Sequence, residues 1–200
     1  MRFGYALGLI VTLLSACASS TTDSDDIREM AFAFPTRLDV CAGMRVSNQP
    51  RDRYSQFAQI TDRVALARAP VETGCLSSGF GKRRSGFHKG IDLHHRTAVD
   101  IYAAGNGVVM EVTKHRDYGR TILISHGDDV FTRYAHIEWI PPRIQPGYQV
   151  SLGEPIATTG HTGNARARHL HYEILFGDYN NPAKSFGLTP IDVLAAPPAN

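Results

Sequence analysis

The sequence predicts a mainly β protein, built as a single small antiparallel β-sheet domain with few short helices. From Cys75 onward, short runs of β-type residues alternate with glycine-bearing turns. Two of these turns, Asn106-Gly107 and Gly127-Asp128-Asp129, stand between runs of strand length. Such turns favour strands that return beside their neighbours, which makes an antiparallel sheet.

Composition supports one globular domain with appendages. The chain has 200 residues, of which 42% are hydrophobic and 20% are charged, an ordinary globular balance. The formal net charge is +2 and both signs are dispersed along the chain, so no basic stripe is present to follow a phosphate backbone. We therefore expect no nucleic-acid partner.

Residues 1–16 are expected to be a lipoprotein signal peptide. Arg2 supplies a positive start, and residues 5–14 are mostly apolar but too few to span a bilayer, which takes about 20 residues. Small residues before Cys17 resemble the bacterial lipobox, which implies cleavage before Cys17 and lipid attachment to its thiol. The alternative is an ordinary or uncleaved secretory signal. No aspartate directly follows the cysteine, which resembles Gram-negative lipoproteins anchored in the outer membrane and facing the periplasm.

The rest of the chain divides into four parts. Residues 17–30 are small, polar and acidic, typical of a solvated tether that carries the lipid. An N-terminal extension is expected over 31–70, the main domain over 71–190 and a C-terminal tail over 191–200. The formation of a disulfide between Cys41 and Cys75 is favoured by an oxidising compartment, and two free buried thiols are the alternative.

One short helix is expected in the extension. Within 54–69, the apolar residues Phe57, Ile60 and Val64 stand at helical spacing among polar residues. The alternative is a first strand over Val64-Ala-Leu-Ala.

The strands of the main domain follow from β-type runs between turn signals. Asn106-Gly107 is suited to the positive φ angles of a tight hairpin between its flanking runs. The expected strands are 99–104, 107–112, 121–125, 130–137, 149–158 and 169–176.

Three separated motifs carry imidazoles and a carboxylate: His88-Lys-Gly-Ile-Asp92, Tyr134-Ala-His136 and His169-Leu-His171. Two histidines and one aspartate are the right ligands, in type and number, for one zinc ion that keeps a fourth position for water. In a strand, alternate side chains share a face, so His169 and His171 project together. Gly90 argues against a helix through the first motif, and His88 is expected to approach from the preceding loop.

These motifs, taken with their flanking turns, resemble the lysostaphin-type (LytM-like) zinc metallopeptidases of bacterial cell walls. The resemblance runs from about residue 75 to about residue 182. It is carried by Ser78-Gly-Phe-Gly-Lys-Arg83, His88-Lys-Gly-Ile-Asp92, Ala104-Gly-Asn-Gly-Val108, Ile124-Ser-His-Gly127, Tyr134-Ala-His136, Gly160-His-Thr-Gly163 and His169-Leu-His-Tyr-Glu173.

The resemblance implies a groove that holds one zinc ion per chain. It implies His88, Asp92 and His171 as ligands, with His136 and His169 as the catalytic histidines. The two catalytic histidines would take the proton of the zinc-bound water, deliver one to the leaving amine or stabilise the oxyanion, in an order that the sequence leaves open.

The remaining polar residues receive plainer interpretations. His126 is expected to hydrogen-bond within its turn, and Glu173 either orients a ligand or is an ordinary structural carboxylate. Arg166 and Arg168 depart from the small residues usual before His169; they are expected to be solvated, with contact to substrate carboxylates as the alternative. The other histidines are expected to face solvent or to form local hydrogen bonds: His94, His95, His115 and His161. Of these, His95 and His161 are candidates for the rim of the groove.

The expected function is hydrolysis of peptide cross-links in peptidoglycan, at D-alanyl–diaminopimelate bonds. A non-catalytic wall-binding or amidase-activating lipoprotein and a zinc D,D-carboxypeptidase are the alternatives. All five site positions are filled, which favours catalysis over the non-catalytic role. Peptidoglycan is the expected substrate, the membrane is an expected partner through the N-terminal lipid, and a protein regulator is left open. The sequence also leaves open whether residues 27–70 cover the groove, with Asn48 as a conceivable occupant of the open zinc position.

Overall fold

The computed structural model describes residues 34–44, 46, 54–84, 86–180 and 188–199, and every regular element among them is a strand. The mainly β prediction is confirmed, but the expected short helices do not occur in these ranges. The same ranges contain no helix that is long and apolar enough to cross a membrane. The predicted signal peptide, Cys17, the tether up to residue 30 and Asn48 lie outside them.

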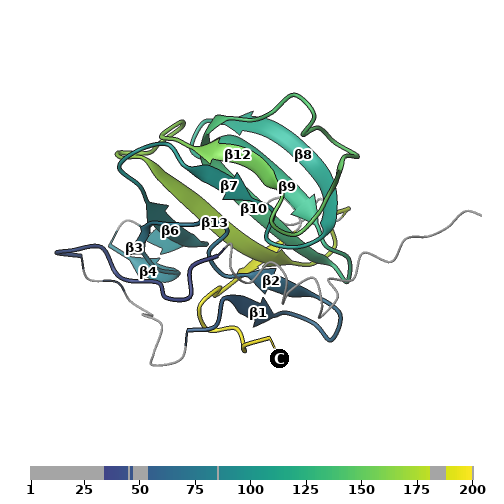
Figure 1. Cartoon of the computed structure of the whole chain (residues 1–200), viewed down its shortest axis with the longest axis horizontal. Helices are drawn as coiled ribbons and strands as arrows, with labels where there is room; N and C mark the ends of the chain where they lie inside the picture. The colour runs from purple at the N-terminus through teal and green to yellow at the C-terminus, as the bar shows by residue number, and fades with distance from the viewer. Residues whose placement is uncertain (1–33, 45, 47–53, 85, 181–187, 200) are drawn as a thin grey trace, which may run out of the picture.

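The strands form one large sheet and two hairpins (Figure 1). The main path of the ten-stranded sheet is β11-β8-β9-β10-β13-β6-β3; β12 pairs with β10 and β7, and β14 pairs with β13. The hairpins are β1-β2 and β4-β5. The bounds are β1 Phe57–Gln59, β2 Ala65–Ala67, β3 Cys75–Ser78, β4 Gly81–Arg83, β5 Gly86–His88, β6 Ile91–His94, β7 Asp100–Tyr102, β8 Gly107–His115, β9 Gly119–Ser125, β10 Val130–Trp139, β11 Gln149–Val150, β12 Pro155–Thr159, β13 His169–Phe176 and β14 Thr189–Ile191.

The expected helix within 54–69 is wrong, and the alternative first strand is correct. Phe57 pairs with Ala67 in the β1-β2 hairpin. Between the strands the chain turns at Thr61, whose Oγ1 accepts a hydrogen bond from the backbone N–H of Val64 at 3.1 Å. Phe57 and Val64 are both buried in the main core, so their helical spacing reflects burial at the two ends of a hairpin.

The expected hairpin at Asn106-Gly107 is also wrong. β7 pairs with β12 and not with β8, and neither residue has a positive φ. Gly107 is needed because a Cβ there would lie 2.4 Å from the carbonyl oxygen of Ser125. The Asn106 side chain accepts a hydrogen bond from the backbone N–H of Leu152 at 2.7 Å, so this dipeptide joins separate parts of the sheet.

Other turns follow the prediction more closely. Gly127, Asp128 and Asp129 all have positive φ, between 50° and 82°, and they separate β9 from β10. The expected run 149–158 is divided into β11 and β12 by a turn at Gly153, whose φ is 74°. The predicted strand 169–176 coincides with β13.

The two faces of the sheet have different roles. In antiparallel strands, directly opposed residues share a face. Tyr134 lies opposite Tyr172, and both are completely buried in the main core. Their neighbours Arg133 and Glu173 also oppose each other, on the other face. That second face is apolar at one end, where Leu123, Phe131, Leu175 and Leu188 form a small cluster, and becomes polar toward His171.

The extension and the C-terminal segment complete the main core, below the large sheet in Figure 1. The core includes Phe34 and Phe57 from the predicted extension and Val193 from the predicted tail. Ala58 forms a β-bridge with Pro198. Buried Arg68 donates hydrogen bonds to the carbonyl oxygens of three residues of the C-terminal segment, Val193, Ala196 and Pro197.

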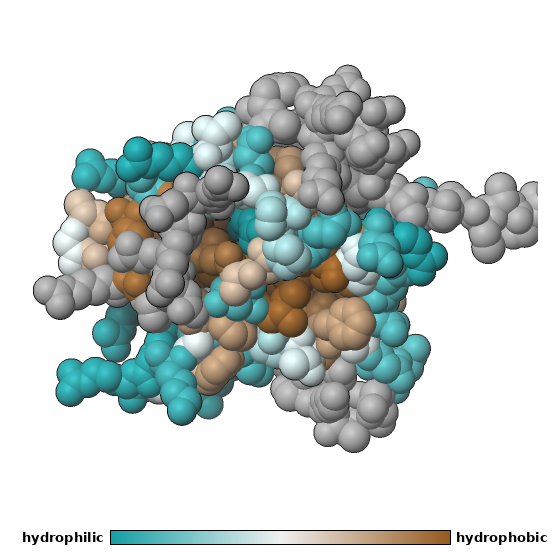
Figure 2. Space-filling model, turned by 90° about the horizontal axis from the view of Figure 1, so that it is seen from below, coloured by the Kyte–Doolittle hydropathy of each residue, from teal (hydrophilic) through white to brown (hydrophobic). Residues whose placement is uncertain are grey.

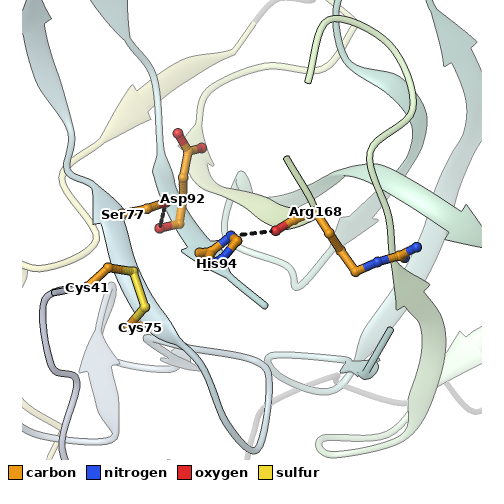
Figure 3. The surroundings of a disulfide bond; sticks show 6 residues. All are labelled: Cys41, Cys75, Ser77, Asp92, His94 and Arg168. Carbon is orange, nitrogen blue, oxygen red and sulfur yellow. Dashed lines mark hydrogen bonds between the residues drawn. A yellow bond between two sulfur atoms is a disulfide. The ribbon is translucent and has the colours of Figure 1, made fainter. Parts of the chain in front are cut away.

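A disulfide joins Cys41 to Cys75, with Cα atoms 4.9 Å apart (Figure 3). It ties the extension to β3, which pairs with β6 so that Cys75 lies opposite His94. Asp92 is two residues before His94 on the same strand, and its carbonyl oxygen accepts a hydrogen bond from Ser77 at 3.1 Å. The disulfide therefore secures the sheet edge beside the candidate site.

The surface is mixed in character. On the face shown in Figure 2, hydrophobic residues reach the surface near the centre, between hydrophilic margins. Among the described residues, the large hydrophobic side chains that are exposed are Met44, Phe87, Trp139 and Phe176.

Candidate metal centre and its histidines

Three adjacent segments converge at one end of the polar face. β5 supplies His88, β6 supplies Asp92 and β13 supplies His171, which lies directly opposite Asp92 in the sheet. His88 was expected on a loop, but it ends the β4-β5 hairpin. Gly90 allows the chain to pass from β5 to β6, because a Cβ there would lie 2.2 Å from the carbonyl oxygen of Tyr172 on β13.

The ligand atoms of these three residues meet at one point. His88 Nε2 lies 3.1 Å from Asp92 Oδ1 and 3.0 Å from His171 Nδ1, and the last two atoms are 2.8 Å apart. Tetrahedral ligands at about 2.1 Å from zinc are separated by about 3.4 Å. The observed separations are about 0.3 to 0.6 Å shorter, so a small outward shift of these side chains would let two imidazole nitrogens and one carboxylate oxygen hold a zinc ion with one open position.

Hydrogen bonds on the outer side of each ring determine which nitrogen of His88 and of His171 faces the centre. His88 Nδ1 donates to the carbonyl oxygen of Gly79 at 2.7 Å, which leaves Nε2 as the ligand atom. His171 Nε2 donates to Glu173 Oε1 at 3.0 Å, which leaves Nδ1. Because carbonyl and carboxylate oxygens only accept hydrogen bonds, each of these neighbours selects one imidazole tautomer.

His136 and His169 lie beside this centre. Their ring centroids are 4.6 Å apart, the ring of His136 is 5.9 Å from that of His171, and His169 Nε2 is 3.7 Å from Asp92 Oδ1. His136 Nδ1 donates to the carbonyl oxygen of Thr162 and His169 Nδ1 to that of Ala167, both at 2.8 Å. Each neutral ring is thereby left with an unprotonated Nε2 that can accept a proton.

The side chain of His136 reaches the site because its backbone breaks the strand pattern. Strand alternation would place His136 on the core face with Tyr134, two residues earlier. Its φ is instead 61°, and the pairing of β10 with β9 shifts between Tyr134 and Ile137. A non-glycine residue in this region carries backbone strain, which often accompanies functional sites.

Burial and neighbouring charges set the protonation of these groups. Burial, with the nearby His169, lowers the pKa of His136 to about 4. Burial also lowers the pKa of His169, against the opposing effect of Asp92. The effect of burial on Asp92 is outweighed by hydrogen bonds from His171 and His88, and its pKa lies well below the usual range. Burial of His171 is outweighed by its hydrogen bonds with Asp92 and Glu173, which raise its pKa to about 9, so a bound metal would have to replace a proton on this ring. The site thus combines an ionised carboxylate with two neutral imidazoles, those of His136 and His169.

Three residues near the candidate ligands were not predicted as site residues. Arg83 donates from Nη2 to Asp92 Oδ2 at 2.9 Å, on the side of the carboxylate away from the histidines. Tyr118 and Arg133 contact Glu173, which is completely buried and is not a surface group. Arg83 belongs to a motif noted in the sequence, but the contacts of Tyr118 and Arg133 depend on cross-strand register, for which the sequence offers no signal.

The other polar candidates are placed as follows. His126 is buried and bonds to the Asn106 carbonyl oxygen and to Thr132, as expected of a structural histidine. His95 is also buried, with 5% of its surface exposed, so its interpretation as a rim residue is wrong; the missing side chain of Gly74 leaves room for its ring. His161 is exposed and lies 3.7 Å from Glu138.

The two arginines before His169 differ from each other. Arg166 is exposed. Arg168 is partly buried, and its guanidinium donates to the carbonyl oxygen of Thr159, so it is not freely solvated. Its own carbonyl oxygen accepts hydrogen bonds from His94 Nδ1 at 2.9 Å and from the backbone N–H of His95 at 3.2 Å (Figure 3).

Comparison with known proteins connects this geometry to a family. Residues 86–182 match peptidase family M23. The peptidoglycan DD-endopeptidase ShyA of Vibrio cholerae is 34% identical over 119 residues, which are 56% of this chain and 27% of ShyA. The murein hydrolase activator NlpD of Escherichia coli is 38% identical over 123 residues, which are 60% of this chain and 31% of NlpD. The chain therefore spans about a third or less of the length of these curated relatives.

A solved structure shares the fold. The crystal structure of a zinc-containing peptidase from Vibrio cholerae superposes with a TM-score of 0.56 and 28% sequence identity, covering 67% of this chain and 40% of that one. The candidate ligands and both neighbouring histidines lie inside the matched range. The chain thus contains a LytM-type peptidase M23 domain, which includes residues 86–182.

Proposed function

We propose that this chain is a zinc-dependent endopeptidase that hydrolyses peptide cross-links of peptidoglycan, at D-alanyl–diaminopimelate bonds. One observation carries the proposal. Four histidines have their outward nitrogens engaged by carbonyl or carboxylate oxygens, and His88 and His171 each direct the other ring nitrogen at one centre beside Asp92. The similarity to a DD-endopeptidase supports the choice of bond.

The roles follow from the geometry. Zinc, bound by His88, Asp92 and His171, would lower the pKa of a bound water to about 7 and polarise the scissile carbonyl. His136 and His169 each present a bare Nε2, held by a hydrogen bond from the opposite ring nitrogen. One of them takes the proton of the attacking water and, as the imidazolium so formed, delivers that proton to the leaving amine; the other, on taking a proton from solvent, would donate to the oxyanion.

Digestion of peptidoglycan tests the function. The chain is incubated with purified sacculi and zinc, and the soluble muropeptides are separated and identified. The proposal expects release of monomeric products from cross-linked material, loss of release after chelation, and recovery on adding zinc. Substituting His169→Ala should abolish release while zinc content stays near the wild-type level. No release by a folded, zinc-loaded chain would refute the enzymatic role.

Two other functions would give different products. A zinc D,D-carboxypeptidase would trim terminal D-alanine from monomeric muropeptides and leave cross-links intact. A non-catalytic activator is favoured by the similarity to NlpD. Such an activator would keep its effect on a partner hydrolase after His169→Ala. The presence of all five site residues around one centre favours catalysis by this chain.

We also propose that Cys17 carries a lipid that anchors the chain in the outer membrane, facing the periplasm. The proposal rests on the apolar leader and on the small residues before Cys17. Detergent partitioning of the wild type and of Cys17→Ser, both expressed with the leader, tests it. The wild type should enter the detergent phase and the variant should stay in the aqueous phase; equal partitioning would remove the anchor.

A further inference from the structure

A buried carboxylate lies behind His171, on the side away from the ligand atoms. Glu173 is completely buried and accepts hydrogen bonds on both oxygens. Oε1 accepts from His171 Nε2 at 3.0 Å and from the Tyr118 hydroxyl at 2.7 Å. Oε2 accepts from Arg133 Nη1, also at 2.7 Å. Every donor reaches Glu173 from a different segment: β13, the turn before β9, and β10.

The sheet and the ring contacts hold this cluster in one arrangement. Arg133 lies directly opposite Glu173 in the pairing of β10 with β13, and 6% of its surface is exposed. The guanidinium carbon of Arg133 lies 5.6 Å from the centre of the Tyr118 ring. The Tyr118 ring is in turn 5.4 Å from that of His171. Tyr118 thus contacts both the carboxylate and the imidazole that the carboxylate orients.

Fold stability alone is a weak explanation for such a cluster. A buried ion pair loses much of its Coulomb attraction to desolvation, and apolar replacements of similar size often stabilise a protein as well or better. The cluster does something that apolar residues could not do. A fixed carboxylate behind His171 keeps a proton on Nε2 and directs Nδ1 toward Asp92 and His88, as a metal ligand at that point requires.

We propose that Arg133 and Tyr118 are positioning residues of the metal centre, which act through Glu173 to hold His171 in its Nδ1-binding tautomer. The inference rests on the proposed function, in that it assigns the centre to a metal. It concerns metal affinity, however, and not cleavage.

Two kinds of variant separate positioning from plain structure. Tyr118→Phe removes one hydroxyl and keeps the backbone carbonyl that accepts from the N–H of His136 at 2.8 Å. Tyr102→Phe is the matched control, because the Tyr102 hydroxyl also donates to a carboxylate, Glu72 Oε1 at 2.6 Å, outside the centre. The second kind is Glu173→Gln, alone and combined with Arg133→Met. In Glu173→Gln, the NH₂ group of the new amide must face either His171 or Arg133, so one of these two donors loses its acceptor. The added Arg133→Met substitution removes the buried guanidinium that Glu173→Gln leaves without a carboxylate.

Three measurements are made on each variant: zinc affinity by competition with a chromogenic chelator, the visible absorption of the Co²⁺-loaded chain, and the thermal midpoint without metal. We expect Tyr118→Phe to weaken zinc binding about 3- to 10-fold and Glu173→Gln about 10- to 100-fold, with altered Co²⁺ spectra. Tyr102→Phe should match the wild type. The double variant should recover thermal stability relative to Glu173→Gln but not zinc affinity.

The results decide the proposal without reference to cleavage. Zinc affinity within twofold of the wild type in Tyr118→Phe, or its recovery together with stability in the double variant, would overturn the positioning role. If the Glu173 variants do not fold, Tyr118→Phe against Tyr102→Phe decides alone. A chain that shows the expected affinities but does not digest sacculi would refute the proposed function and leave this inference standing.

Discussion

Acid should destabilise the fold through one buried histidine outside the candidate metal centre. The ring of His126 has 1% of its surface exposed and lies between the Asn106 carbonyl oxygen and the Thr132 hydroxyl, each at 2.8 Å. Burial lowers its pKa to about 4 from the model-peptide value of 6.5, although the hydrogen bond to Asn106 opposes that shift. The neutral ring is therefore the form that the folded chain holds.

The sign of the effect follows from proton binding. The unfolded chain binds a proton at His126 below about pH 6.5, whereas the folded chain does so only near pH 4, so stability falls as the pH drops between these values. For one such group the loss between pH 7.5 and pH 5 is about 2 kcal/mol, and the full loss below pH 4 is about 3 kcal/mol. Above pH 7.5 the histidine contributes no pH dependence.

Chemical unfolding of the wild type and His126→Gln at pH 7.5 and pH 5, with the disulfide intact, measures this contribution. The variant should be less stable at pH 7.5, but its free energy of unfolding should fall by about 2 kcal/mol less than that of the wild type on going to pH 5. Other titrating groups are common to both chains and cancel in the difference. Parallel stability curves would refute the reasoning. If the variant does not fold, an NMR titration of His126 that gives a pKa near 6.5 would do the same.

Three further outcomes are expected. Gly90→Ala should lower the thermal midpoint and weaken zinc binding together, because its Cβ would press on the backbone of β13; a fully stable variant would contradict the close approach. Arg68→Met should destabilise the chain by about 2 to 4 kcal/mol and speed proteolysis within 193–199, because three carbonyl oxygens lose their donor; wild-type protease resistance would argue against the contact. Zinc at about 100 times its dissociation constant should stabilise the wild type by about 3 kcal/mol and His171→Ala by much less, in differential scanning fluorimetry; equal shifts would place the metal elsewhere.

The sequence predicted best where a local pattern determines structure. Strand β13 was predicted with its exact bounds, because His169 and His171 alternate with apolar residues that enter the core. The turn at Gly127 was predicted because its residues adopt the positive φ that their types tolerate. The sequence did not reveal why Gly107 is a glycine. The reason is not its φ angle but the backbone of Ser125, on the paired strand β9, which leaves no room for a Cβ.

The sequence predicted which five residues lie together, but not how their side chains are oriented. The resemblance named the five residues that the structure brings together. It did not show that His136 turns toward them by leaving the strand conformation, since Tyr134-Ala-His136 has the residue pattern of an ordinary strand, in which His136 would share the core face with Tyr134. The resemblance also did not predict the contact between Arg133 and Glu173, because the register of two strands 40 residues apart depends on the whole sheet.

The contact between Arg68 and residues 193–197 has a consequence for folding. The carbonyl oxygens that accept hydrogen bonds from Arg68 lie 125 to 129 residues farther along the chain, and Pro198, the bridge partner of Ala58, lies in the same segment. A buried guanidinium without its acceptors is costly, so this layer of the core stays open until residues 193–198 arrive. This layer of the core is therefore expected to close late in folding, and a chain truncated before residue 193 should remain protease-sensitive around the hairpin.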